Sequence, residues 1–528
     1  MAFSYGLSAH SALQKMKAVV SDFTRAIWES LGWEAFGVDD RIEIKDVTQD
    51  SRQVKKGSAF FAYDGHKVRG KDFIWDAFDR NAAAVFVDRE YKEEIFNDSR
   101  YNKNLPLFFN HDFQRGAGRT ISFLYGEPTR YMSCIGVTGT NGKTTIAHSL
   151  YQALSHLNKP SMYIGTLGME VSRHKSQTGM TTPDTVNLQH MLHQGQKQKA
   201  LYACLETSSH GLAQGRLEGI NFQIGIFTNL TQDHLDYHRN MEAYYRAKRR
   251  LFEYMLFASR KQPETAKGSI VCIDDDYGRR LYHWLKGQNP SFPVISLSTR
   301  DKNADAYITD VEATFDGYRC VVVFAQKSYF IKTRLLGRFN LVNLASVFLS
   351  LLCLGFGTDE ALEAIQQVEP VPGRFEVLRG LEQRTVIIDY AHSPDALAKV
   401  LETAQELTPA RVIGLFGCGG DRDKEKRPQM AEVASLHADL CILTNDNPRS
   451  EDPKNIIEDM RKGLKTARYL VITDREKAIR AGLQILGPRQ VLVIAGKGHE
   501  DYQIIGNKAL HFSDRETALK LMGSLKIR

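Results

Sequence analysis

The sequence predicts an α/β protein of three domains, and three observations predict it. The chain has 528 residues, which is too long for a single hydrophobic core. Apolar, strand-like runs alternate with helix-like segments, a pattern typical of parallel sheets that helices cover on both faces. A glycine-bearing turn joins one such strand to a helix. We expect an α/β domain with an N-terminal extension at 1–128, a central parallel-sheet domain at 129–371 and a second parallel-sheet domain at 372–528.

The first two regions are recognised by their short apolar runs. In the first, strand-like pieces at 59–62 and 84–87 precede a Gly-Glu-Pro-Thr linker at 126–129. The second begins with a strand at 132–137 and a helix at 146–157. It continues with further strands at 201–205, 224–228 and 270–273, consecutive β-strands between 306 and 336, and a buried helix at 341–356.

The third region repeats the alternation with longer apolar strands. These are expected at 386–388, 412–416, 440–443, 470–472 and 491–494. A helix is expected at 394–407, because Ser393 suits the N-cap and Pro394 the first helical position. Such strands predict a parallel sheet, and ligands of open parallel sheets bind beyond the carboxyl ends of the strands.

Composition and charge exclude several classes of protein. The formal net charge of +7 is a mild basic excess without a dense Lys/Arg block, so it suits anionic small molecules and not nucleic acid. Seven dispersed cysteines, with no Cys-x-x-Cys pair, indicate reduced thiols. No secretory signal or membrane span is recognisable. We therefore expect a cytoplasmic, monomeric protein.

The most informative segment is the loop 139–145, Gly-Thr-Asn-Gly-Lys-Thr-Thr, between the strand at 132–137 and the helix that follows. Loop amides and a helix N-terminus bind phosphate oxygens, lysine adds a positive charge, and a threonine hydroxyl suits magnesium. The position five residues before Gly142 is Val137, where the common phosphate-loop pattern has glycine. The loop predicts binding of ATP with Mg²⁺ by a central domain of the P-loop ATPase type.

Polar residues follow most of the other predicted strands. They include Glu206, His234, Asp389 with His392, and the runs 417–423, 446–449 and 496–500. Glu206 and His234 are candidates for contacts with magnesium or phosphate, although an N-capping carboxylate and an ordinary loop histidine are the alternatives. Arg449 suits a substrate carboxylate, the alternative being a surface ion pair with the neighbouring acidic residues.

These motifs together resemble the Mur ligases, ATP-dependent amino-acid ligases of peptidoglycan synthesis, from about residue 46 to the C-terminus. The resemblance implies an N-terminal uridine-nucleotide domain, a central ATPase domain and a C-terminal Rossmann-like domain. Within the family the chain is most similar to members that add meso-diaminopimelate to the D-glutamate γ-carboxylate of UDP-N-acetylmuramoyl-L-alanyl-D-glutamate. The implied reaction passes through an acyl phosphate.

The resemblance also implies a role for individual residues. Those for the uridine-nucleotide substrate are Ser51, His66, Thr181, Thr182, Ser208, Gln214 and Arg216. Those for ATP are Gly139, Thr140, Asn141, Gly142, Lys143, Thr144, Thr145, Asn340, Asn343, Arg374, Asp389 and His392. Those for the incoming amino acid are Arg422, Asp446, Asn447, Pro448, Arg449, Gly496 and Glu500.

The implied catalytic residues are Lys143, Glu206, His234 and Lys248. Magnesium would be held by Thr144, Glu206 and Lys248, the last carbamylated to an N6-carboxylysine. Without the resemblance, the sequence around Lys248 predicts an exposed lysine on a helix; only the resemblance implies a role in binding magnesium.

The Asp-Asn-Pro-Arg run at 446–449 is similar to the motif of diaminopimelate-adding members, whereas lysine-adding members lack its arginine. Arg449 and Arg422 suit the second carboxylate of diaminopimelate, and Glu500 suits its ammonium. A site built around such partners rejects an analogue that lacks them. The alternatives are a lysine-adding ligase, a ligase related to folylpolyglutamate synthetase, and a mechanical or regulatory P-loop ATPase that joins no substrates.

Overall fold

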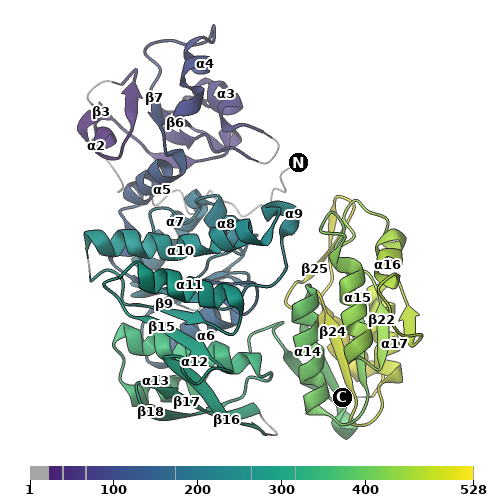
Figure 1. Ribbon diagram of the computed structural model, residues 1–528. Helices are drawn as coiled ribbons and strands as arrows, with labels where there is room; N and C mark the ends of the chain where they lie inside the picture. The colour runs from purple at the N-terminus through teal and green to yellow at the C-terminus, as the bar shows by residue number, and fades with distance from the viewer. Residues whose placement is uncertain are drawn as a thin grey trace.

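The computed structural model describes residues 23–38, 41–65, 68–172, 174–262, 264–314 and 317–526. Its strands form three main sheets, one in each third of the chain. In Figure 1 the N-terminal domain lies above the central domain, and the C-terminal domain lies beside the central one. The three-domain α/β architecture predicted from the sequence is confirmed.

The N-terminal domain is built on a five-stranded sheet of order β2-β7-β6-β5-β4, in which only the edge strand β2 runs antiparallel. Its strands are β2 (Glu34–Phe36), β4 (Asp46–Thr48), β5 (Ser58–Phe61), β6 (Ala84–Asp88) and β7 (Leu107–Asn110). A separate pair consists of β1 (Phe23–Thr24) and β3 (Arg41–Ile42). Its helices are α2 (Arg25–Ser30), α3 (Ile74–Asp79), α4 (Lys92–Phe96) and α5 (Phe113–Leu124), with single turns η1 (Ser51–Gln53), η2 (Gly70–Phe73) and η3 (Arg89–Tyr91).

The central domain contains an eleven-stranded sheet of order β11-β10-β9-β12-β8-β13-β14-β15-β16-β17-β18. The strands from β9 to β16 in this order are parallel, and antiparallel strands form both edges. The strands are β8 (Ser133–Thr138), β9 (Ser161–Gly165), β10 (Gly168–Val171), β11 (His174–Ser176), β12 (Tyr202–Glu206), β13 (Phe222–Phe227), β14 (Gly268–Cys272), β15 (Val294–Ser298), β16 (Ala306–Thr314), β17 (Gly317–Phe324) and β18 (Lys327–Thr333).

Helices cover both faces of this sheet (Figure 1). They are α6 (Lys143–His156), α7 (Thr185–Lys197), α8 (Ser209–Ala213), α9 (Leu235–His238), α10 (Met241–Lys261), α11 (Asp276–Gly287), α12 (Phe339–Leu354) and α13 (Thr358–Gln366), and the turn η4 (Pro128–Arg130) precedes β8. Strand β8 lies between β12 and β13, so the loop that follows it opens at the middle of the sheet.

The C-terminal domain has a six-stranded sheet of order β19-β20-β24-β21-β22-β23, parallel except for β19. Its strands are β19 (Glu376–Arg379), β20 (Thr385–Asp389), β21 (Val412–Phe416), β22 (Leu440–Leu443), β23 (Tyr469–Val471) and β24 (Val491–Ala495), and a separate hairpin pairs β25 (Tyr502–Ile505) with β26 (Lys508–His511). Its helices are α14 (Pro394–Leu407), α15 (Lys426–His437), α16 (Pro453–Arg461), α17 (Arg475–Ile485) and α18 (Asp514–Ser524), and η5 (Leu381–Gln383) is a single turn.

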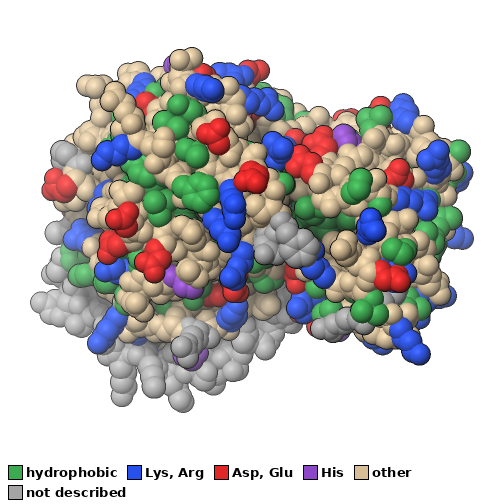
Figure 2. All heavy atoms as spheres, turned by 90° about the horizontal axis from the view of Figure 1, so that it is seen from below, with side chains coloured by type: hydrophobic (Ala, Val, Ile, Leu, Met, Phe, Trp, Pro, Cys, Tyr) green, Lys and Arg blue, Asp and Glu red, His purple; other side chains and the backbone are tan. Residues whose placement is uncertain are grey.

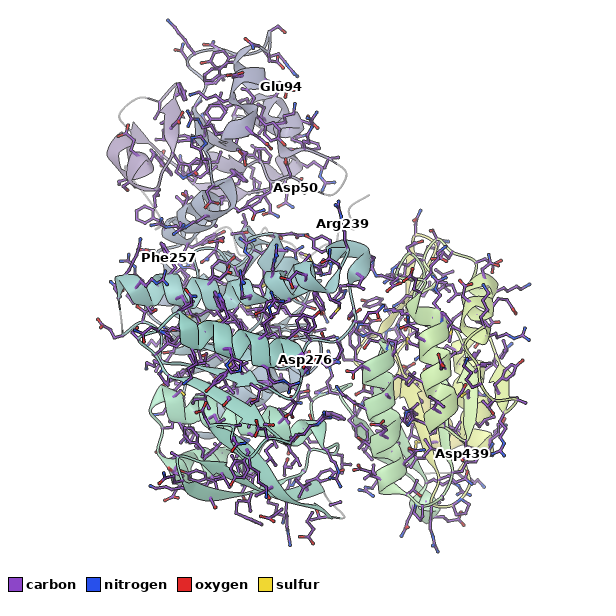
Figure 3. The ribbon with its side chains drawn as sticks, in the orientation of Figure 1. Asp50, Glu94, Arg239, Phe257, Asp276 and Asp439 are labelled. Atoms are coloured by element: carbon purple, nitrogen blue, oxygen red, sulfur yellow. The ribbon has the colours of Figure 1, made fainter. Side chains whose placement is uncertain are left out.

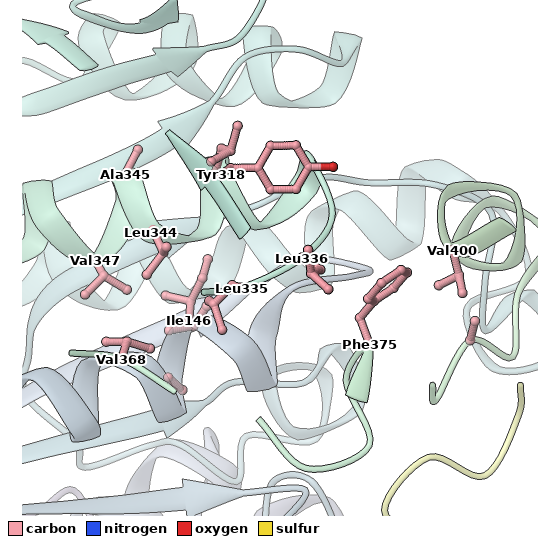
Figure 4. Packing of buried hydrophobic residues seen from close by; sticks show 14 of the residues in the cluster. Ile146, Tyr318, Leu335, Leu336, Leu344, Ala345, Val347, Val368, Phe375 and Val400 are labelled. Carbon is pink, nitrogen blue, oxygen red and sulfur yellow. The ribbon is translucent and has the colours of Figure 1, made fainter. Parts of the chain in front are cut away.

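One apolar cluster joins the central and C-terminal domains. It contains Ile146 of α6 and Leu336 before α12, and it continues through Phe375 to Val400 of α14 (Figure 4). All four side chains are buried. Because burial of apolar surface favours association, this packing holds α14 against the side of the central domain.

The strands and helices that the sequence placed in the second and third regions are all present, although further helices and strands lie between them. Helix α14 begins at Pro394, and the Ser393 hydroxyl accepts a hydrogen bond from the Ala396 amide, as predicted. The β-rich segment from 306 to 336 forms the antiparallel edge β16–β18. All seven cysteines lie within the described residues and are unpaired. In the same part of the chain, no helix is long and apolar enough to cross a bilayer.

Candidate functional site

A large crevice of about 1400 Å³ runs between the central and C-terminal domains, where the strands of both sheets end. Charged side chains of both signs lie along the junction of the two domains in Figure 2. Polar residues from every cluster predicted at the strand ends line this crevice, including Glu206, His234, Asp389, Asp446 and Glu500. Their convergence supports one shared site and not a set of separate loops.

The phosphate loop lies on the central side of the crevice, between β8 and α6. Gly139 has a φ of 148°, and a Cβ atom there would lie 1.8 Å from the Thr228 hydroxyl, so only glycine fits. Helix α6 begins at Lys143, which places the last loop amides at a helix N-terminus. The Lys143 Nζ atom donates to the carbonyl oxygens of Gly139 at 3.0 Å and Thr140 at 2.8 Å.

Lys248 lies on α10 and is almost fully buried, so the exposed helix lysine suggested by the residues alone is wrong. Its Nζ atom donates to the Gly139 carbonyl at 2.7 Å and lies 4.5 Å from the centre of the Tyr244 ring. Burial, reinforced by the positive charge of Lys143, holds the pKa of Lys248 well below its usual range. Burial also lowers the pKa of Lys143.

Glu206 ends β12 and is held by four hydrogen bonds. Its carboxylate accepts from the Thr144 hydroxyl at 3.0 Å, the Tyr163 hydroxyl at 2.5 Å, and the amide and hydroxyl of Thr166 at 2.8 and 3.1 Å. Ser208, and not Glu206, is the N-cap of the following helix α8, so the capping alternative is wrong. The Thr144 hydroxyl also accepts a hydrogen bond from Arg374 at 2.8 Å.

Whether magnesium fits the site depends on the oxygen atoms that these residues offer as metal ligands. Within the described residues, no group of three or more His, Cys, Asp or Glu side chains could hold a metal ion. Glu206 and the Thr144 hydroxyl supply two oxygen atoms of the kind that magnesium prefers. A lowered pKa favours the neutral amine form of Lys248 that carbamate formation requires, and a carbamate there would add oxygen atoms of the kind that magnesium prefers, so the residues present fit the metal.

His234 lies in a cluster of aromatic rings beside the phosphate loop. The rings of His210 and His234 are 4.9 Å apart, and those of His238 and Tyr244 are 5.0 Å apart. Burial lowers the pKa values of His210 and His238 to about 4 and that of His234 to about 3. These imidazoles are therefore neutral at pH 7, and a neutral ring nitrogen can bind a cation.

Asp233 connects this cluster to the C-terminal domain. Burial would raise the pKa of Asp233, but the imidazole of His392 beside it outweighs burial and holds the pKa well below its usual range. The His392 Nε2 atom lies 3.7 Å from the Asp233 carboxylate. A second contact between the domains is a hydrogen bond from the Asn141 side chain, whose Nδ2 atom donates to the Asp395 carboxylate of α14 at 3.0 Å.

The other residues predicted to bind ATP divide into lining and supporting positions. Asn343, Arg374, Asp389 and His392 line the crevice, whereas Asn340 is buried and its Oδ1 atom accepts from the Asn343 amide at 2.8 Å. Burial raises the pKa of Asp389, and the charge of Arg374 opposes this effect. Of the loop 139–145, Gly139 alone is absent from the lining.

The predicted amino-acid pocket forms the far end of the crevice. Arg422, Asp446, Asn447, Arg449, Gly496 and Glu500 line it, whereas the buried Pro448 does not. The Arg449 Nη1 atom donates to the Gly420 carbonyl at 2.8 Å. Burial and then the charge of Arg422 lower the pKa of Arg449, while Asp446 and Glu500 oppose the shift.

Arg449 does not form the surface ion pair that was the alternative interpretation. Glu451 instead pairs with the buried Arg427 at 2.8 Å. The backbone of Arg449 has a φ of 52° and is held by the hairpin, since its amide donates to the Ile504 carbonyl at 3.1 Å and its carbonyl accepts from the Gly506 amide at 2.7 Å. The hairpin thus fixes where Arg449 lies.

The residues predicted for the uridine-nucleotide substrate are divided between two cavities. Thr181, Thr182, Ser208 and Arg216 line the crevice. Gln214 and Arg216 line a second cavity of about 280 Å³, together with Tyr63 and Asp64 of the N-terminal domain. Arg216 therefore connects the two spaces.

Two predicted residues lie elsewhere. Ser51 is buried in η1 and lines neither cavity; its neighbour Asp50 lies at the edge of the N-terminal domain that faces the central domain (Figure 3). His66 lies outside the described residues, so the structure gives no position for it.

The sequence did not single out several residues that shape the site. Tyr163 and Thr166 hold Glu206, and a strand end at Gly165 was the available signal, because β9 is parallel to β12 and ends beside it. Lys497 belonged to the run 496–500 but was given no role, and Asp233 directly precedes His234. Asp395 sits one residue inside α14 and was hidden within a helix start.

Comparisons with known proteins agree along most of the chain. Residues 43–106 match the model for the Mur ligase family, catalytic domain. Residues 137–351 match the Mur ligase middle domain, and residues 373–498 match the model for the Mur ligase, glutamate ligase domain.

Two curated relatives carry the same name, UDP-N-acetylmuramoyl-L-alanyl-D-glutamate--2,6-diaminopimelate ligase. The protein from Coxiella burnetii is 40% identical over 91% of this chain and 96% of its own length. The protein from Geobacillus kaustophilus is 37% identical over 90% of this chain and 94% of its own length.

Solved structures are similar over the same extent. One described by the same ligase name is 31% identical, has a TM-score of 0.65 and covers 93% of this chain and 96% of that chain. The structure of MurF from Acinetobacter baumannii is 16% identical, has a TM-score of 0.63 and covers 96% of this chain and 100% of that chain, which shows a shared fold.

Proposed function

The chain belongs to the Mur ligase family, and from that premise we propose that it joins meso-diaminopimelate to the D-glutamate γ-carboxylate of UDP-N-acetylmuramoyl-L-alanyl-D-glutamate at the expense of ATP. The observation that carries this proposal is the shared crevice. Residues of all three predicted sets line it: Thr140–Thr145 of the phosphate loop, four of the residues predicted for the muramoyl-peptide nucleotide, and Asp446, Asn447 and Arg449. Three substrates bound there would have their reacting groups within one space.

The first step transfers the γ-phosphoryl group of ATP to the substrate carboxylate. The loop amides and Lys143 would hold the phosphates, and the chain's own basic groups would offset the charge that gathers on the oxygens transferred. An acyl phosphate and ADP are the products of this step. Catalysis by this site rests on positioning and charge compensation.

Magnesium, when bound, would neutralise phosphate charge at this step. Thr144, Glu206 and a carbamylated Lys248 are the residues we propose to hold it. Tyr163 and Thr166 keep the Glu206 carboxylate in position, and Arg374 keeps the Thr144 hydroxyl donating toward Glu206. His234, neutral at pH 7, is a further candidate beside the loop.

In the second step the amine of diaminopimelate attacks the acyl phosphate carbon, forms the amide bond through a tetrahedral intermediate and expels phosphate. Arg449 and Arg422 would pair with the distal carboxylate of the amino acid, and Glu500 with its distal ammonium. Lysine has no distal carboxylate, so its binding would leave the half-buried Arg449 without a carboxylate to pair with.

The uridine part of the substrate would reach toward the second cavity, where Gln214 and Arg216 meet the N-terminal domain. Cytoplasmic synthesis of peptidoglycan precursors is the setting in which these substrates occur together. The test is to incubate the protein with ATP and the muramoyl dipeptide nucleotide, offer diaminopimelate or lysine, and weigh the product. An adduct of diaminopimelate supports the proposal, and an adduct of lysine alone would establish the lysine-adding alternative.

A further inference from the structure

Lys497 is a buried lysine directly behind the amino-acid pocket. Its side chain has no exposed surface and does not line the crevice, although its neighbours Gly496 and Glu500 do. Charged side chains are rarely this deeply buried unless a partner compensates them. The residues that compensate the charge of Lys497 should therefore indicate its role.

The partners of Lys497 are Glu500 and the loop beyond it. The Nζ atom lies 3.1 Å from Glu500 Oε2, donates to the Tyr502 carbonyl, and lies 5.4 Å from the centre of the Tyr502 ring. The Nδ2 atom of the Asn447 side chain also donates to Glu500 Oε2, at 3.0 Å. One oxygen of Glu500 is therefore occupied by two donors of the protein.

The other oxygen of Glu500 is the one available to a ligand. Glu500 Oε1 has a single long contact, 3.5 Å to the Tyr390 hydroxyl, among the described residues. The Glu500 side chain keeps 14% of its surface exposed and lines the crevice. Lys497 and Asn447 thus hold Oε2 in place and leave Oε1 as the oxygen with fewer protein donors.

Lys497 also changes the charge that a ligand meets. Glu500 and Lys497 carry opposite charges, so the pair has no net charge. Arg449 and Arg422 remain nearby, and burial together with the charge of Arg422 lowers the pKa of Arg449. A ligand group that carries both an ammonium and a carboxylate satisfies Glu500 and Arg449 together. A bare ammonium meets a carboxylate already compensated, and leaves the arginines unpaired.

We propose that Lys497 is a specificity-determining residue, which positions Glu500 and makes the pocket select an amino acid with a zwitterionic distal end over one with a bare distal ammonium. This inference rests on the proposed function, because it concerns the amino acid added in that reaction. Lys497 acts through Glu500 and does not itself touch the substrate.

The test is the variant Lys497→Gln, which removes one positive charge behind Glu500. The ratio of kcat/KM for diaminopimelate to kcat/KM for lysine is expected to fall about tenfold, because the pocket becomes more negative and favours the cation. The KM for ATP should stay within about twofold of the wild-type value. Lys497→Arg keeps the charge and should restore the ratio to within about threefold of wild type.

Lys424→Gln is the matched control. Lys424 belongs to the same domain and its removal deletes the same charge, but its side chain is 67% exposed and lies 3.6 Å from Glu451, outside the crevice lining. The ratio of kcat/KM for diaminopimelate to kcat/KM for lysine should be the same in Lys424→Gln as in the wild type. An unchanged ratio in a folded Lys497→Gln variant, with both amino acids slowed equally, would show a purely structural lysine and overturn the proposal.

Asn447→Asp covers the case in which Lys497→Gln does not fold. This variant makes the surroundings of Glu500 more negative by one charge and leaves the buried side chain of Lys497 in place. The ratio of kcat/KM for diaminopimelate to that for lysine should therefore fall, as in Lys497→Gln. An unchanged ratio would contradict the proposal. The affinities of both amino acids are measured in parallel by calorimetry. Absence of amide formation by the wild type would refute the proposed function, while the ratio of affinities would still decide the role of Lys497.

Discussion

Lys143 and Lys248 donate hydrogen bonds to the same carbonyl oxygen, that of Gly139, at 3.0 and 2.7 Å. The two residues come from different helices, α6 and α10, and are 105 positions apart in the chain, yet their amines meet at the start of the phosphate loop. Burial and the positive charge of Lys143 lower the pKa of Lys248, so two charged amines at this point would need bound negative charge to compensate them. This arrangement indicates that the loop is built for phosphate oxygens together with a further acidic group.

Replacement of Lys143 by alanine should abolish most of the activity. The variant loses the charge that would hold the β- and γ-phosphates, so phosphate release that depends on both other substrates should fall by about a hundredfold or more. Lys159→Ala is the control, because Lys159 is exposed in the loop after the same helix. Undiminished turnover in Lys143→Ala would refute the assignment of ATP to this loop.

Replacement of Lys248 by methionine should change how stability depends on pH. The pKa of Lys248 is lower in the folded protein than in the unfolded chain, so the folded state binds fewer protons between those two values. The free energy of unfolding of the wild type therefore rises with pH there, relative to the variant, by at most about 1.4 kcal/mol per pH unit.

The measurement for Lys248 is denaturant unfolding of both proteins between pH 7 and about pH 10, the usual lysine pKa, in buffer free of carbon dioxide. Parallel stability curves would contradict the lowered pKa. Addition of bicarbonate should raise the activity of the wild type and add the mass of carbon dioxide to the peptide that contains Lys248. The variant should show neither effect.

Removal of the Tyr163 hydroxyl should weaken magnesium binding without unfolding the protein. Tyr163→Phe deletes one of the four hydrogen bonds that hold Glu206, and loss of such support commonly costs about tenfold in metal affinity. Stability should fall by about 1 kcal/mol. The concentration of magnesium that gives half-maximal activity, together with calorimetric binding of magnesium and ADP, measures the effect.

Tyr282→Phe is the matched control for this prediction. The Tyr282 hydroxyl donates to Asp305 at 3.0 Å in the same domain, away from the phosphate loop. Equal magnesium requirements in both variants would show that Tyr163 does not act on the metal site.

The contact between Tyr163 and Glu206 also explains the glycine at position 165. A Cβ atom at Gly165 would lie 2.3 Å from Glu206 Oε1 and 2.4 Å from the Tyr163 hydroxyl, so a larger residue would not fit.

Replacement of Arg449 by alanine should affect diaminopimelate far more than ATP. The variant removes the partner of the distal carboxylate, and truncation of one member of a charged pair costs about 2–5 kcal/mol, or roughly thirtyfold or more in kcat/KM for the amino acid. The affinity for ATP should change by less than about twofold. Arg461→Ala is the control, since Arg461 is an exposed arginine of the same domain that pairs with Glu458.

The outcome that would assign Arg449 a structural role is an equal loss of affinity for ATP and for diaminopimelate. Its positive φ and its backbone hydrogen bonds to the hairpin remain in the alanine variant, so the backbone of the loop need not change. The melting temperature of each variant separates loss of the site from loss of the fold.

The sequence predicts the fold well where local signals and burial agree. The run Val412–Phe416 is apolar throughout and forms the fully buried central strand β21, and Ser393 with Pro394 fixes the start of α14. The hairpin β25–β26 was missed, because its residues are mostly exposed and carry no alternating apolar pattern. Its stability comes from hydrogen bonds to the 446–449 loop, which only the tertiary structure supplies.

The site was predicted less completely than the fold, for a related reason. The loop 139–145 and the run 446–449 are contiguous motifs, so their residues were found directly. Lys248 gives no local signal, since its burial depends on the packing of α10 against the sheet and on Gly139 from another element. Tyr163, Asp395 and Lys497 likewise act through partners distant in sequence or buried behind the surface.

The most direct test of the account follows one oxygen atom from substrate to product. The muramoyl dipeptide nucleotide is prepared with heavy oxygen in its γ-carboxylate and is incubated with the protein, ATP and diaminopimelate; the inorganic phosphate released is then analysed by mass spectrometry. An acyl phosphate that is attacked at carbon leaves one carboxylate oxygen in phosphate, so we expect one heavy oxygen in each phosphate and an amide product that contains diaminopimelate. Unlabelled phosphate released without an amide product would contradict the account and identify the protein as an ATPase that joins no substrates.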